Sequence, residues 1–535
     1  MNMLRKKTVT SAAGALALAA FGLPALADNR PETMVMAWNV DAISSFDPAQ
    51  AADAVTAELL QNICDRLVDI DPDDESRVVP GVAESWKVSE DGRAITFTLR
   101  EGMKFPSGRV ATAQDMAWSL QRIVKIGLGA ASAITEYGFN KDNVETAITA
   151  PDDRTLVMTF DKPYPPSLVL QGVAAFYVAS LVDRETVMAA AVDGDLGNKY
   201  LGTRTECVGP YRLVRWNPGE VVVLERNEDY YGARPAMRQI IVRHVVETGT
   251  QRLMLGKGDI DVARDLTPED ISDLSQSPDI RVVTTYKPQI THLALNNANE
   301  AFAKPEVRLA LRYLLDYDAM QESFLKNIGV MRASPVQLGA FGALDAEEGQ
   351  PFSLDVEKAK TLLAQAGYPD GFETKMIIGT HSYAMPIAQH FQENAAKAGI
   401  KVSIERMANA QLFSRIRGRD FELGIMSWQT SVGDAHGMLS RQVYNPDNSA
   451  EAKLSQYPSW RSSYFSQDMN TRVMDALVEK DDARRAEAYR LIQQEMMQQG
   501  PQVYVFQTTQ NAATRATLKD WRFNSYRVYY NLVSK

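Results

Sequence analysis

The segment spanning residues 80–116 constrains the fold more than any other part of this chain. It contains the dipeptide Asp91-Gly92, a preferred tight turn between two strands. After this turn, apolar residues occupy every second position: Ile95, Phe97 and Leu99. Such alternation predicts a strand with one buried face, and Thr112 then stands where a helix can begin. The segment is therefore expected to form a tight turn, a half-buried strand and, after a second turn at Ser107-Gly108, a helix.

The residue types of this segment also match a family signature. Ala83-Glu-Ser-Trp86 precedes Leu99-Arg-Glu-Gly-Met-Lys-Phe105, and Thr112-Ala-Gln-Asp115 begins the helix. In this order the segment resembles the extracytoplasmic solute-binding proteins of peptide, opine and nickel ABC importers, the family 5 proteins that include dipeptide- and oligopeptide-binding proteins. Further landmarks of the resemblance cover nearly the whole chain, among them Gly209-Pro-Tyr211, Gly258-Asp-Ile-Asp-Val262 and Leu293-Ala-Leu-Asn-Asn297.

The N-terminal residues 1–27 have the three parts of a secretory signal peptide. A basic start at residues 5–7 is followed by a short apolar stretch at residues 12–21 and by the small-x-small motif Ala25-Leu26-Ala27. A membrane anchor is the alternative, but it needs about 20 apolar residues and this stretch is shorter. We therefore expect cleavage before Asp28 and a periplasmic mature protein.

The remainder of the chain predicts an α/β protein with more than one lobe. Strand and helix patterns mix without a fixed repeat, and the length exceeds what one hydrophobic core organises. The resemblance implies the two-lobed periplasmic-binding-protein fold, with two hinge crossings and an extra subdomain in lobe I. We place lobe I at residues 28–288 and 504–535, its inserted subdomain at about residues 75–205, and lobe II at residues 289–503.

The chain has two cysteines, Cys64 and Cys207. An oxidising compartment permits them to form a disulfide, which would close a long loop. Two separate buried thiols that pack as small apolar groups are the alternative. The sequence leaves this choice open.

Composition and motifs argue against catalysis and against nucleic-acid binding. The formal net charge is −10, and no basic cluster follows the signal peptide. The chain contains no nucleophile elbow, phosphate-binding loop, dinucleotide fingerprint or zinc-binding helix. The histidines lack the spacing of a metal pair: His244, His292, His381, His390 and His436. Since distant carboxylates can assemble in a fold, a secreted hydrolase is the alternative of a different class. We expect no enzyme activity, no cofactor and no bound metal.

Trp428 is the strongest candidate for a ligand contact. It ends an apolar run that begins at Phe421, and such proteins enclose their ligand at strand ends between the lobes. A tryptophan packed in the core is the alternative. The resemblance to peptide binders implies a Trp-x-x-Asp motif here, whose Asp pairs with the α-ammonium group of the peptide. This chain has Ser431 at the Asp position, and a desolvated ammonium without a counter-charge costs several kcal/mol. Asp434, further along, is expected to be structural.

Other candidate ligand contacts come from several parts of the chain. Ser44 and Ser45 follow the first predicted strand, and Tyr137 and Phe139 follow the helix of the signature segment. In lobe II the candidates are aromatic residues and arginines suited to a ligand carboxylate: Arg441, Trp460, Arg461 and Tyr464. For each, a turn, a packing contact or an ordinary ion pair is the alternative.

Together these features predict the substrate-binding subunit of an ABC importer. It is expected to be a monomer that captures a polar organic solute between its lobes and delivers it to the permease subunits in the membrane. The missing carboxylate at Ser431 favours an opine-like conjugate or a modified peptide with acidic groups and no free α-ammonium. A metal chelate or nickel complex is the alternative cargo within the family.

Overall fold

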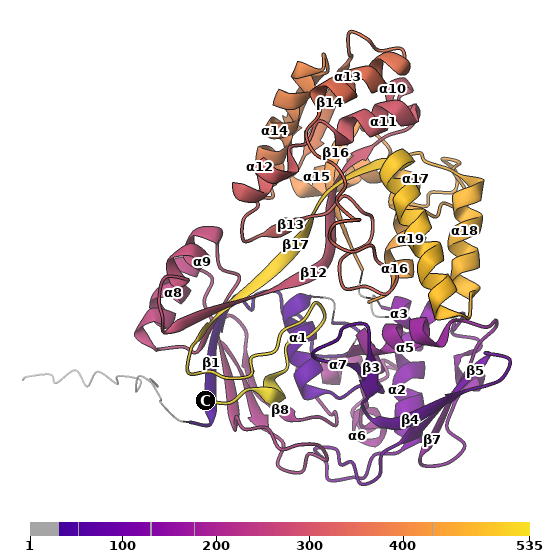
Figure 1. The fold of residues 1–535 in the computed structure, drawn as a ribbon. Helices are drawn as coiled ribbons and strands as arrows, with labels where there is room; N and C mark the ends of the chain where they lie inside the picture. Colours follow the sequence, from indigo (N-terminus) through magenta and orange to yellow (C-terminus); the bar gives the residue numbers. More distant parts are fainter. Residues whose placement is uncertain (1–30, 52, 129–130, 176, 431) are drawn as a thin grey trace, which may run out of the picture.

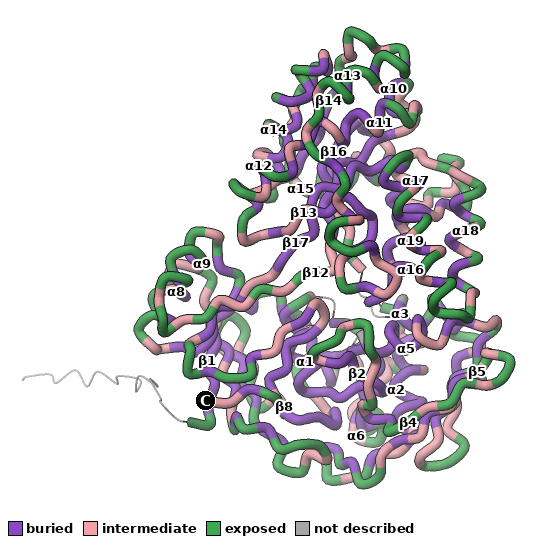
Figure 2. Tube along the Cα trace, viewed as in Figure 1, coloured by how far each residue is buried: buried purple, intermediate pink, exposed green. Residues whose placement is uncertain are grey.

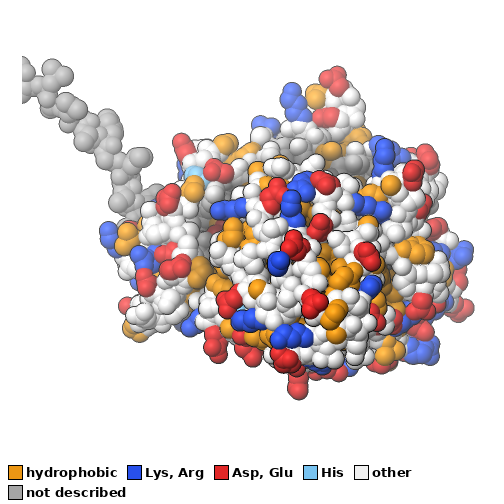
Figure 3. Space-filling model, turned by 90° about the horizontal axis from the view of Figure 1, so that it is seen from above, with side chains coloured by type: hydrophobic (Ala, Val, Ile, Leu, Met, Phe, Trp, Pro, Cys, Tyr) orange, Lys and Arg blue, Asp and Glu red, His pale blue; other side chains and the backbone are white. Residues whose placement is uncertain are grey.

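The computed structural model describes residues 31–535, except residues 52, 129–130, 176 and 431, and has two lobes stacked one above the other (Figure 1). The predicted signal peptide and Ser431 lie outside the described residues. Among the residues that are described, no helix has the length and apolar character needed to cross a membrane. On the face seen in Figure 3, basic and acidic side chains are interspersed rather than gathered by sign.

A continuous mixed sheet runs through both lobes and connects them. Its strands lie in the order β15-β14-β16-β12-β17-β11-β1-β10-β9-β8, and β13 (Gly329–Met331) pairs with β17. The bounds, in that order, are Lys401–Arg406, Glu373–Ile378, Leu423–Gln429, Ile280–Leu295, Gln502–Arg515, Val262–Arg264, Thr33–Trp38, Gln239–His244, Val221–Arg226 and Tyr211–Asn217. Because the sheet is shared, the relative position of the lobes depends on the strands that join them.

The two longest of these strands, β12 and β17, cross from one lobe to the other as an antiparallel pair (Figure 1). Their pairing shifts register between Tyr286 and Ile290. Pro288 stands inside this interval, and a proline within a strand is tolerated at such a bulge because it has no N–H to donate to the ladder. The chain therefore changes lobe at an irregular point of the sheet.

Lobe I adds a smaller sheet and most of the N-terminal helices. The small sheet has the order β4-β5-β7-β6, with bounds Ala83–Val88, Ala94–Leu99, Thr155–Thr159 and Ile148–Thr149, and a separate pair joins β2 (Val68–Ile70) to β3 (Val78–Pro80). The helices are α1 Ala54–Ile63, α2 Ala113–Ile126, α3 Ser132–Thr135, α4 Val144–Ala147, α5 Pro166–Ala175, α6 Arg184–Ala189, α7 Asn198–Leu201, α8 Thr248–Lys257 and α9 Pro268–Leu274.

The turn, strand and helix predicted for the signature segment are confirmed. The strands β4 and β5 pair antiparallel around a turn in which Gly92 has φ +73°, a left-handed conformation that glycine adopts freely. The alternate residues of β5 are buried as the pattern requires. Thr112 and Asp115 form a reciprocal capping box at the start of α2, which satisfies backbone N–H groups that the helix leaves unpaired.

Lobe II is rich in helices. These are α10 Glu300–Ala303, α11 Pro305–Arg312, α12 Tyr317–Glu322, α13 Val356–Gln365, α14 Ala384–Lys397, α15 Asn409–Arg417, α16 Ala435–Gln442, α17 Pro458–Arg461, α18 Gln467–Val478 and α19 Asp482–Gln499. Figure 1 shows α16 and α18 reaching down beside α3 and α5 of lobe I. Figure 2 shows buried chain inside each lobe and exposed chain around it, in keeping with separate hydrophobic clusters in the two lobes.

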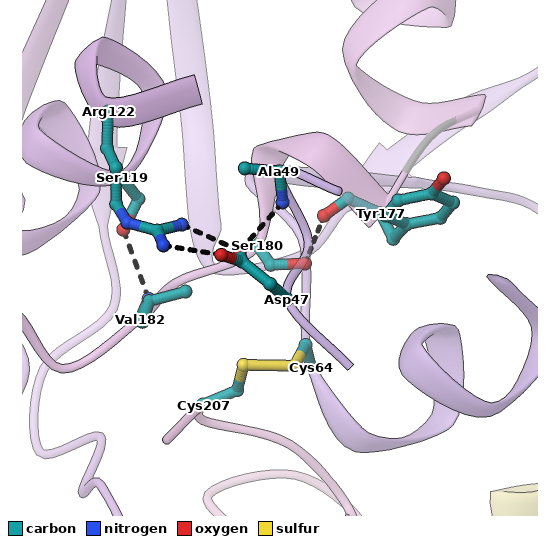
Figure 4. Close-up of a disulfide and its surroundings, with 9 residues drawn as sticks. All are labelled: Asp47, Ala49, Cys64, Ser119, Arg122, Tyr177, Ser180, Val182 and Cys207. Carbon is teal, nitrogen blue, oxygen red and sulfur yellow. Dashed lines mark hydrogen bonds and ion pairs between the residues drawn. A yellow bond between two sulfur atoms is a disulfide. The ribbon is translucent and has the colours of Figure 1, made fainter. Parts of the chain in front are cut away.

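A disulfide and a buried ion pair hold the start of lobe I together (Figure 4). Cys64, which ends α1, is bonded to Cys207, 143 residues later in the chain. Nearby, the guanidinium of Arg122 in α2 donates two hydrogen bonds of 2.7 and 2.6 Å to the carboxylate of Asp47. Since Asp47 belongs to the loop between β1 and α1, both links fix the part of lobe I that follows the first strand.

Candidate functional site

Trp428 lies near the end of β16, directly opposite Ile290 of the crossing strand β12. Its ring is half-buried, and the guanidinium carbon of Arg461 lies 5.4 Å from the ring centroid. The indole N–H is buried without a hydrogen-bond partner among the described residues. The predicted aromatic residue is thus placed at the end of β16 beside the lobe crossing, next to a cation.

Arg461 is a cation with few partners of its own. Its Nε donates a hydrogen bond of 2.6 Å to the carbonyl oxygen of Ser455, and the described residues provide no carboxylate for it. Burial, together with the nearby charge of Arg417, lowers the pKa of Arg461 to about 10. A ligand carboxylate would supply the missing hydrogen-bond acceptors.

His292 lies on the neighbouring strand in the same region. It is buried, and its Nδ1 has no hydrogen-bond partner among the described residues. Burial and, to a smaller degree, the charge of Arg461 lower the pKa of His292 to about 4, so the ring is neutral at pH 7.

Asp434 has the structural role expected of it. Its Oδ2 accepts a hydrogen bond of 2.6 Å from Arg485, and its Oδ1 accepts one of 2.9 Å from the backbone N–H of His436 at the start of α16. The carboxylate is fully buried in this pair. Asp434 is therefore not free to bind the ammonium group of a ligand.

A cavity of about 170 Å³ lies in lobe I beside the crossing strands, and we call it the lobe I cavity. Its walls are aromatic and charged: Trp38, Glu58, Arg264, Asp265, Lys287, Phe523, Tyr526 and Arg527 contribute to it. Lobe II comes close to it, since Gln337 Nε2 donates to the hydroxyl of Tyr526 at 3.5 Å. The cavity thus borders the junction between the lobes.

The wall of this cavity is fixed by contacts between distant segments. Trp38 ends β1, and its indole N–H donates to Asp265 at 2.5 Å. The guanidinium of Arg264 stacks 4.2 Å from the centroid of the Trp38 ring and is held by Glu58 through hydrogen bonds of 2.6 and 2.8 Å. A pre-formed aromatic surface with a few placed polar groups suits an organic ligand.

A second cavity, of about 210 Å³, lies between the lobes near α3 and α16, and we call it the interlobe cavity. Lobe I contributes Tyr137, whose hydroxyl donates to the carbonyl oxygen of Leu168 at 3.1 Å. Lobe II contributes Arg441, which forms an ion pair of 2.5 Å with Glu136 across the gap. Arg441 therefore has a protein carboxylate as its partner in this arrangement of the lobes.

Three of the candidate ligand contacts, Ser44, Ser45 and Phe139, lie in lobe I. Ser45 is buried and accepts a hydrogen bond from the backbone N–H of Asp47 at 3.1 Å, whereas Ser44 is exposed. Phe139 is buried against Phe160, with the ring centroids 5.4 Å apart. Ser45 therefore stabilises the loop after β1, and a ligand contact does not fit the position of Phe139.

The two aromatic candidates of lobe II, Trp460 and Tyr464, also have protein contacts. Trp460 is 5% exposed, and its indole N–H donates to the carbonyl oxygen of Ser449 at 2.9 Å while Arg419 stacks on its ring. Tyr464 packs against a hydrophobic cluster formed mainly by α16, α18 and α19, and its hydroxyl points at the sulfur of Met496. The expected ligand contact does not fit Trp460, because both its ring and its N–H already have protein partners.

Sequence reasoning missed Trp38, Arg264, Lys287 and Tyr526, which line the lobe I cavity. They come from four segments that meet only in the folded chain, so no local spacing pointed to them. Within the described part of the chain, no group of three or more His, Cys, Asp or Glu residues is arranged to hold a metal ion.

A family model described as "Bacterial extracellular solute-binding proteins, family 5 Middle" matches residues 77–450. A curated relative, "Probable D,D-dipeptide-binding periplasmic protein DdpA" of Escherichia coli (strain K12), is 29% identical over 497 residues, which cover 92% of each chain.

Solved structures share the fold. HbpA2 from Haemophilus parasuis superposes with a TM-score of 0.79 at 23% identity, covering 94% of this chain and 99% of that chain. The binding protein AgaA from A.tumefacien R10, in complex with agropinic acid, gives a TM-score of 0.68 at 24% identity, covering 94% and 96%.

Proposed function

The chain belongs to the family 5 bacterial extracellular solute-binding proteins, and from this premise we propose that it captures an acidic organic solute in the periplasm. As the substrate-binding protein of an ABC importer, it is a binding protein and not an enzyme. The proposed cargo is an opine-like conjugate or a modified peptide without a free α-ammonium group, delivered to the permease subunits of the importer.

The observation that carries this proposal is that the segment following Trp428 has no free carboxylate. The sequence contains none from Gln429, the last residue of β16, to Gly433, and Asp434 is buried in its pair with Arg485. A desolvated ammonium group placed there would have no counter-charge, which costs several kcal/mol. Arg461, in contrast, lies over the Trp428 ring and suits an anionic ligand.

Native mass spectrometry of freshly purified protein tests the proposal. A closed cleft is expected to retain its ligand, which should appear as a discrete added mass and should be acidic when released. Treatment with EDTA is expected to leave this mass in place, whereas its loss together with a metal would favour a metal chelate as cargo.

A thermal-shift series tests the ligand class directly. A ligand that binds only the folded state raises the apparent melting temperature in a saturable way, without turnover. D-alanyl-D-alanine, a D,D-dipeptide like those named for the Escherichia coli relative, is expected to give no shift because it carries a free amine. Micromolar binding of such free-amine dipeptides or tripeptides in calorimetry would refute the proposal.

A further inference from the structure

The lobe I cavity contains a cation that no described residue neutralises. Lys287 is half-buried in β12, and its side chain lines the cavity. Among the described residues, none forms a hydrogen bond or an ion pair with its ammonium group. Lys287 therefore differs from the other charged residues of this cavity.

The other charges in the cavity wall already have partners. Glu58 holds Arg264, and also accepts a hydrogen bond of 2.6 Å from the hydroxyl of Tyr530. Arg527 pairs with Asp69, outside the cavity. Asp265 is exposed to solvent and accepts the indole N–H of Trp38. With these contacts in place, Lys287 is the cation left for a ligand in the described wall.

The backbone around Lys287 is fixed on both sides. Its carbonyl oxygen accepts a hydrogen bond of 3.0 Å from the side chain of Gln507 in β17. The next residue, Pro288, accepts one of 3.0 Å from the backbone N–H of Thr430, in the loop after Trp428. Lys287 thus stands where the two lobes meet, at a position that does not depend on its own side chain.

The surroundings of Lys287 favour a bound anion. Burial lowers the pKa of Lys287, and the charge of Arg264 acts in the same direction while Asp265 opposes it. A buried amine with no acceptor loses the hydrogen bonds that water would give it. A carboxylate is the group that restores both the hydrogen bond and the opposite charge.

We propose that Lys287 binds a carboxylate of the transported solute, whose apolar part lies against the half-buried ring of Phe523. This inference rests on the proposed function and deepens it, because it assigns the acidic group of the solute to a place in the cleft. It makes Lys287 a specificity-determining residue that selects acids over amines at the lobe junction.

Matched pairs of ligands test this proposal. A panel of dipeptides is offered to the mature protein both as free amines and as N-succinyl derivatives, in which a carboxylate replaces the ammonium group. Calorimetry is expected to show N-succinyl derivatives binding at least about tenfold more tightly than their free-amine partners. Lys287→Gln should remove most of this preference, since a charge-assisted hydrogen bond contributes about a tenfold effect or more.

Control variants separate ligand binding from a structural role. Lys104→Gln removes an exposed lysine outside the cavity and should leave the N-succinyl preference within about threefold. If Lys287 serves only to balance Asp265, Lys287→Gln will change the melting temperature without changing the preference, which overturns the proposal. Lys287→Met serves as a second variant, and the melting temperature of each shows whether it has folded.

The remaining outcomes are also decisive. A wild-type protein that shows no N-succinyl preference, or prefers free amines, overturns the assignment of Lys287. Native mass spectrometry on the same preparation then judges the proposed function separately. A retained acidic solute that Lys287→Gln holds as tightly as the wild type would contradict the Lys287 assignment and keep the proposed function, whereas a retained solute without an acidic group would contradict both.

Discussion

Cations buried inside the lobes differ from two cations at the lobe junction, Lys287 and Arg461, in whether a protein carboxylate pairs with them. In the interior, Arg122 pairs with Asp47 and Arg264 pairs with Glu58, each through two hydrogen bonds. At the junction, Lys287 and Arg461 have no carboxylate from the described residues. Burying a charge is costly unless it is paired, so the difference identifies which cations need a partner from outside.

The absence of a carboxylate partner does not by itself identify a cation that binds a ligand. Arg312 and Arg332 are fully buried without an acidic partner among the described residues, yet each donates to at least three backbone carbonyl oxygens. Those oxygens accept most of the hydrogen bonds of the two guanidinium groups, although they supply no opposite charge. Arg461, by comparison, has one carbonyl partner, and the described residues give Lys287 none. The useful criterion is therefore unfilled hydrogen-bonding capacity at the surface of a cleft.

The largest effect should follow from breaking an interior pair. Arg122→Met leaves the carboxylate of Asp47 buried without its cation, and we expect a loss of about 3–5 kcal/mol in the free energy of unfolding. Urea denaturation of the variant measures this loss. Asp47→Leu together with Arg122→Met should recover much of it, because neither charge is then stranded.

Two single variants test the contrast between paired and unpaired cations. Arg93→Met, at an exposed arginine, should change the free energy of unfolding by no more than about 0.5 kcal/mol. Lys287→Met should change the free energy of unfolding equally little, although Lys287 is half-buried, because the substitution removes no contact with a described protein partner. A loss of several kcal/mol in Lys287→Met would place Lys287 with the interior cations and would contradict the comparison.

An intermediate effect is expected at Arg461, and it should appear in binding rather than in stability. Arg461→Met removes the cation over the Trp428 ring, so we expect retention of the acidic solute to weaken by about tenfold. Native mass spectrometry under increasing dilution measures the retention. The free energy of unfolding should change by less than about 1 kcal/mol.

Arg417→Met is the matched control for this variant. Arg417 is exposed and lies close enough to Arg461 to affect its pKa, but it lacks the contact with Trp428. Its removal should leave retention within about twofold. Equal weakening in the two variants would mean that the general positive charge of the region matters, and not the position of Arg461.

The sequence was most informative where structure is local. The turn at Gly92, the strand after it and the helix start at Thr112 follow from neighbouring residues, and all are present in the fold. The structural role of Asp434 was likewise expected. The pairing of Cys64 with Cys207 was left open, because a contact across 143 residues depends on the whole lobe.

The residues that line the lobe I cavity could not be predicted from local sequence patterns, and the reason is physical. The indole N–H of Trp38 reaches Asp265 across 227 residues, and Lys287 is positioned by Gln507 across 220. Such contacts arise from the order of strands in the sheet, which spacing along the chain does not reveal. At Trp460 the local pattern suggested too much. This aromatic residue lies in a polar segment and was expected to contact the ligand, but it is buried.

The smallest predicted effect on stability concerns His292. This basic side chain is buried in its neutral form, unlike the paired arginines and the unpaired Lys287 and Arg461. Burial lowers the pKa of His292 to about 4, below the value near 6.5 expected in the unfolded chain. Between these values the unfolded state binds more protons than the folded state. The corresponding stability is therefore complete above pH 6.5 and is lost as the pH falls toward 4.

His292→Gln should remove this dependence. Between pH 7 and pH 5.5, we expect the variant to lose about 1 kcal/mol less of its free energy of unfolding than the wild type, as measured by urea denaturation at each pH. His381→Gln, at an exposed histidine, should follow the wild-type curve. Parallel curves for His292→Gln and the wild type would show that His292 keeps its proton in the folded state. It would then join Lys287 and Arg461 as a third unpaired cation at the junction, which would make an anionic solute still more necessary there.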